Sequence, residues 1–474
     1  MQRAKRIGQK ANRGAALMLC ALLPCLGTGT ASATSDEKAV LTPSQMRTAA
    51  ADLLRLRNPQ QAMVLADALI ARDPHDRSAL LIRSRAARDL GNYTLARKAA
   101  KRAWSLSETD EEKYAAALIT AQALSSGGQR TLAQFWLRRA VEHAPDERLE
   151  RRAVRDFRYL RATSPWLLRF SFSVSPESNI NNGSSERSSF LNYRMSELLL
   201  GQPVEYQLGG TQQALSGIEY ELGIRSRYRF HQTETRAHDL AFSLTSRTYT
   251  LSSDAKAQAP GAEGNDFAFT SYQVGYGLKG INLDRHGEFR VAVDLGQSWY
   301  GGEEYARFLR LSAGQSYKLE RGRRINARLS HEIQDGVATS DQNTSRGDLS
   351  YSFKLASGAT LWTNLSLAGA TSNRASDEFQ EIGLRTQLTL GKPVFGAVAR
   401  FGLWGRVRDY DVSPHSPDGR HDDYYQADIS LTFKKIDYYG FNPTLSMTAA
   451  KVDSNIGLFE SNRFGVNFGI QSAF

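Results

Sequence analysis

From Trp166 to Phe474 the chain alternates between apolar and polar positions, in segments separated by turn residues. The last segment shows the pattern well, because every second residue from Phe464 to Ile470 is apolar and the residues between are Gly, Asn or similar polar types. Side chains that alternate in this way lie on opposite faces of a β-strand. Strands of about ten residues with one apolar and one polar face are typical of a transmembrane barrel wall. A single such strand is equally consistent with the edge of a soluble sandwich, but a long series favours the barrel.

The alternation predicts fourteen strands, an even number as in most single-chain bacterial barrels. Connections after odd-numbered strands are mostly long and those after even-numbered strands mostly short, which indicates outer loops and periplasmic turns. We therefore expect an α + β chain in which helices precede a 14-stranded antiparallel transmembrane β-barrel over 166–474. The expected strand ranges are 166–175, 215–230, 236–250, 267–280, 287–300, 304–319, 323–335, 345–356, 359–371, 379–391, 394–409, 422–436, 441–453 and 461–474.

Charged residues occupy the polar face of several strands, so they are expected in the lumen, since a charge facing lipid at mid-depth costs a few kcal/mol. Two interpretations remain open. The charges form ion pairs that stiffen the wall, or they form a basic pore that selects anions. The candidate lumen charges are Glu219, Glu221, Arg225, Arg227, Arg229, Arg290, Asp294, Arg324, Arg328, Glu332, Glu381 and Arg385.

The N-terminal residues 1–33 have the layout of a secretory signal peptide: a basic start, an apolar run and small residues at Ala31-Ser32-Ala33. Cys20 and Cys25 are the only cysteines and both lie in this segment, so the exported chain would have no thiol chemistry. Cleavage of this segment would remove its five basic residues and lower the formal charge of the chain from +11 to about +6. We expect an exported protein that does not meet nucleic acid.

Residues 41–163 are rich in Ala, Leu and Arg with apolar residues at helical spacing. Ala62 and Ala96 each begin a second helix, and a third unit containing Ala133 is displaced by about three residues from a repeat of about 34. This pattern resembles tetratricopeptide repeats, which form a curved solenoid with a protein-binding groove. A generic helical bundle is the alternative. We expect this domain in the periplasm.

The segment 147–163 predicts a strongly basic last helix before the barrel. Its arginines either cover a solvated capping face or contact anionic headgroups or the barrel rim. The arginines are Arg148, Arg151, Arg152, Arg155, Arg158 and Arg161.

Two similar motifs lie at the ends of the barrel sequence. The first strand runs into Ser175-Pro176-Glu177-Ser178-Asn179-Ile180-Asn181, and the last strand follows Ser454-Asn455-Ile456. With this order of signal peptide, repeat domain and barrel, the chain resembles the surface lipoprotein assembly modulator (Slam) family, the outer-membrane component of type XI secretion. The resemblance implies an outer-membrane translocator that moves client surface lipoproteins, or related haem- and metal-acquisition proteins, from the periplasm to the cell surface.

The resemblance also implies partners and the absence of enzymatic activity. The expected partners are the client, periplasmic chaperones, the outer-membrane assembly machinery and the lipid bilayer, for a monomeric barrel whose terminal Phe474 is the insertion signal. No cofactor or metal is expected. His421 and Asp422-Asp423 have no serine nucleophile beside them, so we do not expect catalysis.

The two Ser-Asn-Ile motifs should meet at the outer end of the seam where the first and last strands close the barrel. The candidate residues are Pro176, Ser178, Asn179, Ile180, Asn181, Ser454, Asn455 and Ile456. They are either two similar turn devices, since Asn tolerates left-handed backbone, or a latch on a lateral opening.

Two other functions remain open at this point. One is a porin that exports an anionic polysaccharide, and the other is a pore for small anionic solutes. The first outer loop, 176–214, is long enough to fold inward as a plug, and its segment Tyr193 to Leu200 is apolar enough to pack there, so both a plugged and an open pore are left open. A plugged pore would favour a gated translocator over a porin.

Overall fold

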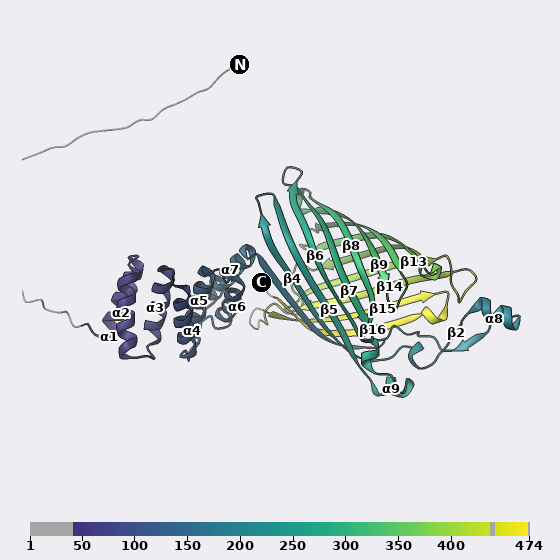
Figure 1. Cartoon of the computed structure of the whole chain (residues 1–474), viewed down its shortest axis with the longest axis horizontal. Coiled ribbons are helices and arrows are strands. Elements are labelled where there is room, and N and C mark those ends of the chain that lie inside the picture. Colours follow the sequence, from purple (N-terminus) through teal and green to yellow (C-terminus); the bar gives the residue numbers. More distant parts are fainter. Residues whose placement is uncertain (1–40, 437–440, 473–474) are drawn as a thin grey trace, which may run out of the picture.

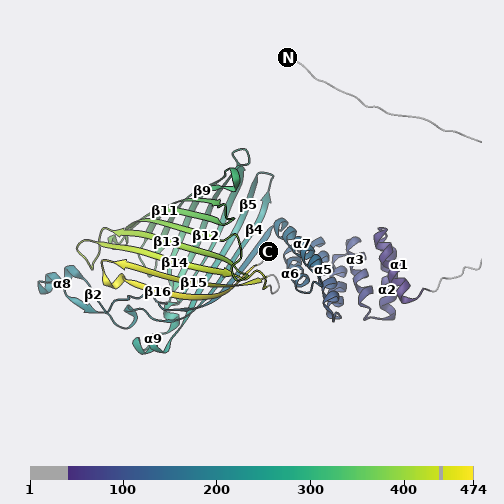
Figure 2. The same cartoon turned by 180° about the vertical axis from the view of Figure 1, so that it is seen from behind.

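The computed structural model describes residues 41–436 and 441–472, which form a row of helices followed by a β-barrel along one long axis (Figure 1). The predicted signal peptide 1–33 and Phe474 lie outside the described residues. The helical row and the barrel meet near Ser164, and the far end of the barrel carries the long loops (Figure 2).

Seven helices precede the barrel in the described residues. They pair as three helical hairpins with a last helix behind them, as the repeat pattern predicts. The helices are α1 (Pro43–Arg55), α2 (Pro59–Arg72), α3 (Arg77–Asp89), α4 (Tyr93–Ser105), α5 (Asp110–Ser126), α6 (Arg130–Glu142) and α7 (Glu147–Thr163).

The three hairpins are built alike at the turn before their second helix. Asn58 and Asn92 cap α2 and α4 with their side-chain oxygens, and Gln129 holds the same place before α6 without such a bond. Ala62, Ala96 and Ala133 follow at the same distance, and all three are completely buried where the helices cross closely. The third unit is displaced because α5 has 17 residues where α3 has 13.

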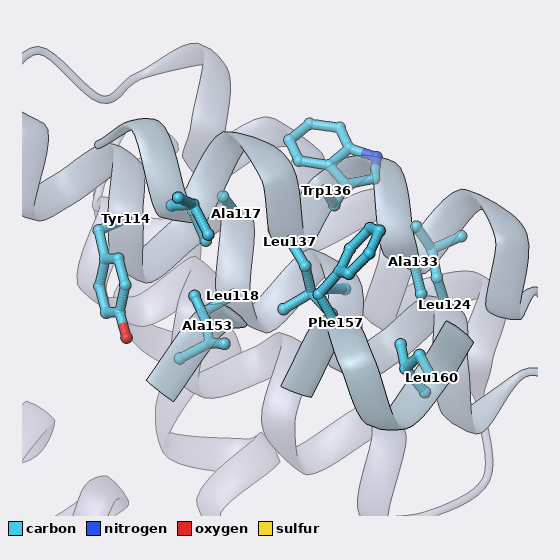
Figure 3. Close-up of a cluster of buried hydrophobic side chains, with 13 residues drawn as sticks. Tyr114, Ala117, Leu118, Leu124, Ala133, Trp136, Leu137, Ala153, Phe157 and Leu160 are labelled. Atoms are coloured by element: carbon cyan, nitrogen blue, oxygen red, sulfur yellow. The ribbon is translucent and has the colours of Figure 1, made fainter. Parts of the chain in front are cut away.

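The largest helical core joins α5, α6 and α7 (Figure 3). Phe157 of α7 is 2% exposed and packs with Leu137 and Leu160. Tyr114 closes the cluster and donates its hydroxyl to the Leu149 carbonyl at 3.2 Å, and burial raises the pKa of this phenol. Helix α7 therefore binds the repeats through one apolar face, and its arginines other than Arg161 are exposed on the remaining surface.

Fourteen antiparallel strands close into one barrel, in sequence order, as predicted. The predicted and observed bounds differ by a few residues. The largest shift at a strand start is at β13, because Val394 and Ala397 pair in a tight turn before the strand begins. The strands are β1 (Trp166–Glu177), β4 (Gly217–Gln232), β5 (Arg236–Leu251), β6 (Phe269–Asn282), β7 (Gly287–Tyr300), β8 (Glu303–Lys318), β9 (Arg324–Gly336), β10 (Gln342–Lys354), β11 (Thr360–Ser372), β12 (Phe379–Thr389), β13 (Val398–Tyr410), β14 (Arg420–Thr432), β15 (Phe441–Ser454) and β16 (Ser461–Ser472).

The outer surface of the barrel is apolar, as the alternation predicts. Leu295 of β7 and Leu329 of β9 are strongly exposed on this surface, while Asp294 and Arg328 beside them point into the lumen. Such a surface is stable only in hydrocarbon, since soluble monomers rarely expose large apolar patches. No helix in the described residues is long and apolar enough to cross a membrane.

The helical row is attached to the barrel rim by side-chain and backbone contacts. The Arg138 guanidinium of α6 lies over the ring of Phe441 at the start of β15, 4.4 Å from its centroid, and also over Phe157. At the join, the amide of Arg229 donates to the Pro165 carbonyl at 2.7 Å. These contacts place the repeats at the mouth of the barrel that carries the short turns.

The first outer loop does not form the plug that its length and apolar segment would allow. The loop contains the short hairpin β2 (Ser188–Phe190) and β3 (Glu205–Gln207) with α8 (Tyr193–Leu200) between them, and it extends beyond the outer end of the barrel (Figures 1 and 2). Leu198 of α8 is 81% exposed. The reason lies at the base of the loop, where hydrogen bonds described below direct the chain outward.

Candidate functional site: the barrel seam and the lumen wall

The barrel closes where β1 meets β16, and this seam is poorly paired. Registered pairs occur only in its outer half, at Ser173–Gly469, Val174–Phe468 and Glu177–Gly465. On its other edge, β1 pairs with β4 at every residue. Within the described residues, the inner half of β1, 166–172, has no registered partner on β16. Since every other ladder of the barrel runs nearly the full length of its strands, the seam is the weakest line in the wall.

Pro176 weakens the outer half of the seam as well. The amide of Ser178 donates to the Phe464 carbonyl of β16 at 3.0 Å. Backbone amides two residues apart point to the same side of a strand, so the nitrogen of Pro176 also faces β16. Proline has no N–H to donate, and it is tolerated in strands chiefly at edges for this reason. The ladder is therefore interrupted at Pro176.

Above this interruption, four residues join the two strand ends, and we call them the seam clasp: Ser178, Asn179, Asn182 and Arg463. The hydroxyl of Ser178 accepts from the Phe464 amide at 2.8 Å. The Arg463 guanidinium donates to the Asn179 carbonyl at 3.0 and 2.6 Å and to the Asn182 side chain at 3.1 Å. Asn182, which follows the motif, has φ 53° and supplies a left-handed turn, whereas the motif residues Asn179, Asn181 and Asn455 are not among the described residues with positive φ.

The other residues of the first motif shape the base of the loop. The side chain of Asn179, 1% exposed, bonds both the amide and the carbonyl of Gly183. Asn181 bonds the backbone of Thr211, Gln213 and Leu215 on the returning strand of the loop. Ile180 is buried in an apolar cluster with Leu215 and Tyr249. Two asparagine amides thus set the path of the chain by binding backbone.

The second motif binds a different neighbour. Ser454 donates to the Asp422 carboxylate at 2.8 Å, and the Asn455 side chain accepts from the His421 amide at 2.8 Å, so both residues bind β14. Ile456 is 3% exposed. The two motifs lie at the same end of the barrel, and three hydrogen bonds join their loops. The Ser184 hydroxyl donates to the Gly457 carbonyl at 2.6 Å, the Ser185 amide to the Glu460 carbonyl at 2.9 Å and the Leu458 amide to the Ser189 hydroxyl at 3.0 Å.

On the lumen side, three polar residues line the seam. Asn467 of β16 donates to the Ser175 hydroxyl of β1 at 2.7 Å. The Glu177 carboxylate lies against Gly465, and a side chain at position 465 would clash with this carboxylate. One oxygen of Glu177 is buried without a hydrogen bond, and Arg463 is 3.8 Å away. Ser175, Glu177 and Asn467 were not predicted as site residues, although their polar positions in the alternation carry the signal.

Much of the lumen wall is ion-paired. Glu381 on β12 is the centre of the densest cluster, since its carboxylate, 2% exposed, binds Arg346, Arg406 and Arg408. The other candidate charges that have ion partners are paired as follows: Arg227 and Arg229 with Asp239, Glu221 with Arg247, Glu332 with Arg310, and Arg385 with Asp428. Glu219 lies opposite Tyr249 and bonds its hydroxyl.

Other candidate charges have no ion partner among the described residues. They are Arg225, Arg290, Asp294, Arg324 and Arg328. The ion-pair interpretation therefore fits one region of the wall, while the basic pore that selects anions stays a hypothesis for the region with the unpaired charges. Sequence reasoning missed the partners that complete the ion-paired region, which are Asp239, Arg247, Arg310, Arg346, Arg406, Arg408 and Asp428.

The family of the chain is shown by its sequence. The profile of a family described as surface lipoprotein assembly modifier matches residues 166–470, which is the barrel and more than half of the chain. The chain belongs to the surface lipoprotein assembly modifier family. The family, with the closed barrel, supports an outer-membrane location, places the helical row in the periplasm and implies a surface lipoprotein as the client.

Solved structures resemble the two parts separately. The Yersinia enterocolitica type III secretion translocator chaperone SycD is 18% identical with a TM-score of 0.23 and covers 25% of this chain and 83% of its own. A loop L8 deletion mutant of the Vibrio cholerae outer membrane protein OmpT is 9% identical with a TM-score of 0.34, covering 64% and 99%. CdiB from Acinetobacter baumannii is 10% identical with a TM-score of 0.35, covering 64% and 59%. A search of curated proteins finds no match.

The described residues hold no group of three or more His, Cys, Asp or Glu side chains that could bind a metal ion. Barrel and family are those of a transporter or channel. The site is therefore best described as a weak seam with a clasp at its outer end, beside a lumen wall that is ion-paired in one region and basic in another.

Proposed function

We propose that this protein is an outer-membrane translocator that delivers client surface lipoproteins from the periplasm to the cell surface through the seam between β1 and β16. The observation that supports this route most directly is the unpaired inner half of β1, 166–172, together with the interrupted ladder at Pro176. The properties of the lumen also support this route for a lipidated client.

An acyl chain would be costly to carry through this lumen. Transfer of acyl chains out of hydrocarbon costs roughly 0.8 kcal/mol per CH₂ group, or on the order of 10 kcal/mol for one chain of about fourteen carbons. The lumen wall carries charged groups such as the cluster around Glu381. An opening in the side of the barrel lets the polypeptide use the lumen while the acyl chains stay in the bilayer.

The clasp gives this opening a closed state. Asn179 and Arg463 hold the outer end of the seam through hydrogen bonds, and no covalent bond needs to break when the strands separate. The three loop contacts between 184–189 and 457–460 close the same end. In the resting barrel we expect the seam to remain shut, since an open strand edge in lipid leaves backbone groups without partners.

The helical row receives the client in this proposal. Its three hairpins lie at the periplasmic mouth, where Arg138 contacts Phe441. Periplasmic chaperones would bring the client, and the outer-membrane assembly machinery would insert the barrel. We infer that the chain has no enzymatic step of its own and acts as a monomeric barrel.

A comparison of surface-shaved proteins between a deletion strain and its parent tests the function. The expected result is that one or a few lipoproteins disappear from the surface and remain in the periplasm. An unchanged protein surface with altered capsule or altered uptake of small anions would instead support a polysaccharide-exporting or solute porin.

A pair of cysteines tests the route. Asn467 and Ser175 contact each other across the seam on the lumen side, so S175C/N467C should form a disulfide that locks it. The matched control is N326C/S350C, since this Asn and Ser contact each other at 3.1 Å across the β9–β10 ladder. The seam disulfide should stop display of the client under oxidising conditions, and its reduction should restore display. The control disulfide should leave display unchanged. Normal display with the seam disulfide fully formed would exclude the lateral route.

A further inference from the structure

One region of the lumen wall carries cations that are not neutralised. Arg225 on β4, Arg290 on β7 and Arg328 on β9 line a single cavity of 720 Å³. All three side chains are exposed to the lumen. Among the described residues, none of them has a carboxylate oxygen within 4.0 Å. This region therefore differs from the wall around Glu381, where three arginines share one carboxylate.

The remaining charges of the cavity do not cancel this excess. Arg310 is paired with Glu332, and Glu288 lies 3.8 Å from Lys279. Asp294 is the one lining carboxylate among the described residues without an ion pair. Among the lining residues, three unpaired arginines thus stand against a single unpaired aspartate, and beyond the lining Asp348 of β10 lies opposite Arg328 in the strand register.

The basic residues continue from the cavity to the periplasmic mouth. Arg169 of β1 lies directly opposite Arg225 of β4. Arg169 and Arg290 both act electrostatically on Arg227, which places them on the same stretch of wall. At the end of α7, burial and then the charge of Arg169 lower the pKa of Arg161. The exposed arginines of α7 precede this series in the chain. We call Arg169, Arg225, Arg290 and Arg328 the basic track.

Such an arrangement is unfavourable without an anionic occupant. Like charges directly opposite each other on neighbouring strands are destabilising. Each guanidinium offers five donors in a planar fork that suits carboxylates. The arginines come from four strands spread around the wall, so one small anion cannot bridge all of them, whereas an extended chain with several carboxylates can.

We propose that the basic track binds an acidic, extended stretch of client polypeptide as it passes from the helical row into the lumen. This inference rests on the proposed translocator function and adds the chemistry of the segment that is carried. Partly solvated arginines bind carboxylates reversibly and with a strong dependence on salt, which suits a segment that must move on.

The test measures binding of a fluorescein-labelled peptide of ten glutamates to the purified full chain in detergent at low salt, by fluorescence anisotropy. We expect R225Q/R290Q/R328Q to weaken binding on the order of tenfold to a hundredfold, because three charged hydrogen-bonding groups are removed. The charge-matched control is R55Q/R57Q/R72Q, whose arginines are exposed on α1, α2 and the turn between them. The control should bind within about twofold of wild type, since these charges lie beyond a Debye length from the track.

Each outcome is decisive for the track. Absence of peptide binding to the wild type, or equal losses in both triple variants, would overturn the inference. Complete displacement by millimolar inorganic phosphate at constant ionic strength would show a site for small anions and would overturn it too. These results leave the translocator function to be judged separately, by surface display of the client in the deletion strain complemented with wild type.

Discussion

Arg463 and Asn179 lie 284 positions apart in the chain, and the guanidinium of the first binds the backbone carbonyl of the second with two hydrogen bonds. The bond joins the start of the last strand to the loop that follows the first. Asn179 is 1% exposed, and the Arg463 side chain is 34% exposed. The Arg463 side chain is therefore one of several groups that hold the outer end of the seam, beside the Ser178–Phe464 bonds and the loop contacts.

Replacement of this arginine should loosen the clasp. R463Q removes charged hydrogen bonds worth about 1.5–3 kcal/mol in total. We expect a lower temperature for the heat-induced mobility shift of the barrel on gels, and faster tryptic cleavage in the loop after β1. R247Q is the control, because Arg247 pairs with Glu221 on the intact β4–β5 ladder. Equal cleavage of the loop in both variants would contradict a specific role for Arg463.

The exposed helix α8 is attached to the barrel through a histidine. The amide of Asn192, before α8, donates to the Nδ1 of His415 in the loop between β13 and β14 at 3.0 Å. The ring also lies against Phe459. Burial, and then the nearby charge of Arg420, lower the pKa of His415. The neutral ring is thus the form that holds the loop.

This contact should weaken in acid. Because the folded-state pKa lies below the ordinary value of about 6.5, the bond is fully present above that pH and is lost as the pH falls through the lowered pKa. Tryptic cleavage after Arg194 in α8 should accelerate between about pH 6.5 and pH 5. H415A should be cleaved rapidly at every pH in this range. A pH response that persists in H415A would assign the effect to another group.

The helical repeats contain one strained turn. Arg57, Gly91 and Gly128 precede the capping residues of α2, α4 and α6, and all three have positive φ, 58° at Arg57. Left-handed backbone costs a residue with a side chain roughly 1 kcal/mol relative to glycine. R57G should therefore stabilise the helical row by about 0.5–1 kcal/mol.

The measurement is guanidinium unfolding of the full chain in detergent, followed by the circular dichroism of the helices. G91A should lower stability by about 1 kcal/mol at the equivalent turn of the next repeat. This explanation requires that R57G raises the free energy of unfolding and that G91A lowers it. A loss of stability in R57G would mean that the side chain, and not the backbone, determines the position.

The strands and the helical repeats could be predicted because each follows a local period. Alternation identified the lumen face of β7 and β9, and the spacing of Ala62 and Ala96 identified the second helix of two repeats. These patterns survive in the sequence because every residue of one face has the same environment, either lipid or water.

The pairing of lumen charges could not be predicted in the same way. Arg346 on β10 reaches Glu381 on β12 across an intervening strand, and Arg385 reaches Asp428 in the same manner. Such contacts depend on strand register and side-chain length together. The path of the first loop could not be predicted for a related reason, since the amide of Asn181 binds the Gln213 carbonyl, 32 positions along the chain.

Pro176 offers the most direct test of the weak seam, because one substitution can complete its ladder. P176V supplies an N–H that faces Val466 of β16, and one further backbone hydrogen bond stabilises the seam by about 0.5–1.5 kcal/mol. We expect a more heat-stable barrel and slower display of the client at the surface. P443V is the control, since Pro443 lies on β15 and not on the seam. A valine at 176 that stabilises the barrel without slowing display would show that the client does not pass between β1 and β16.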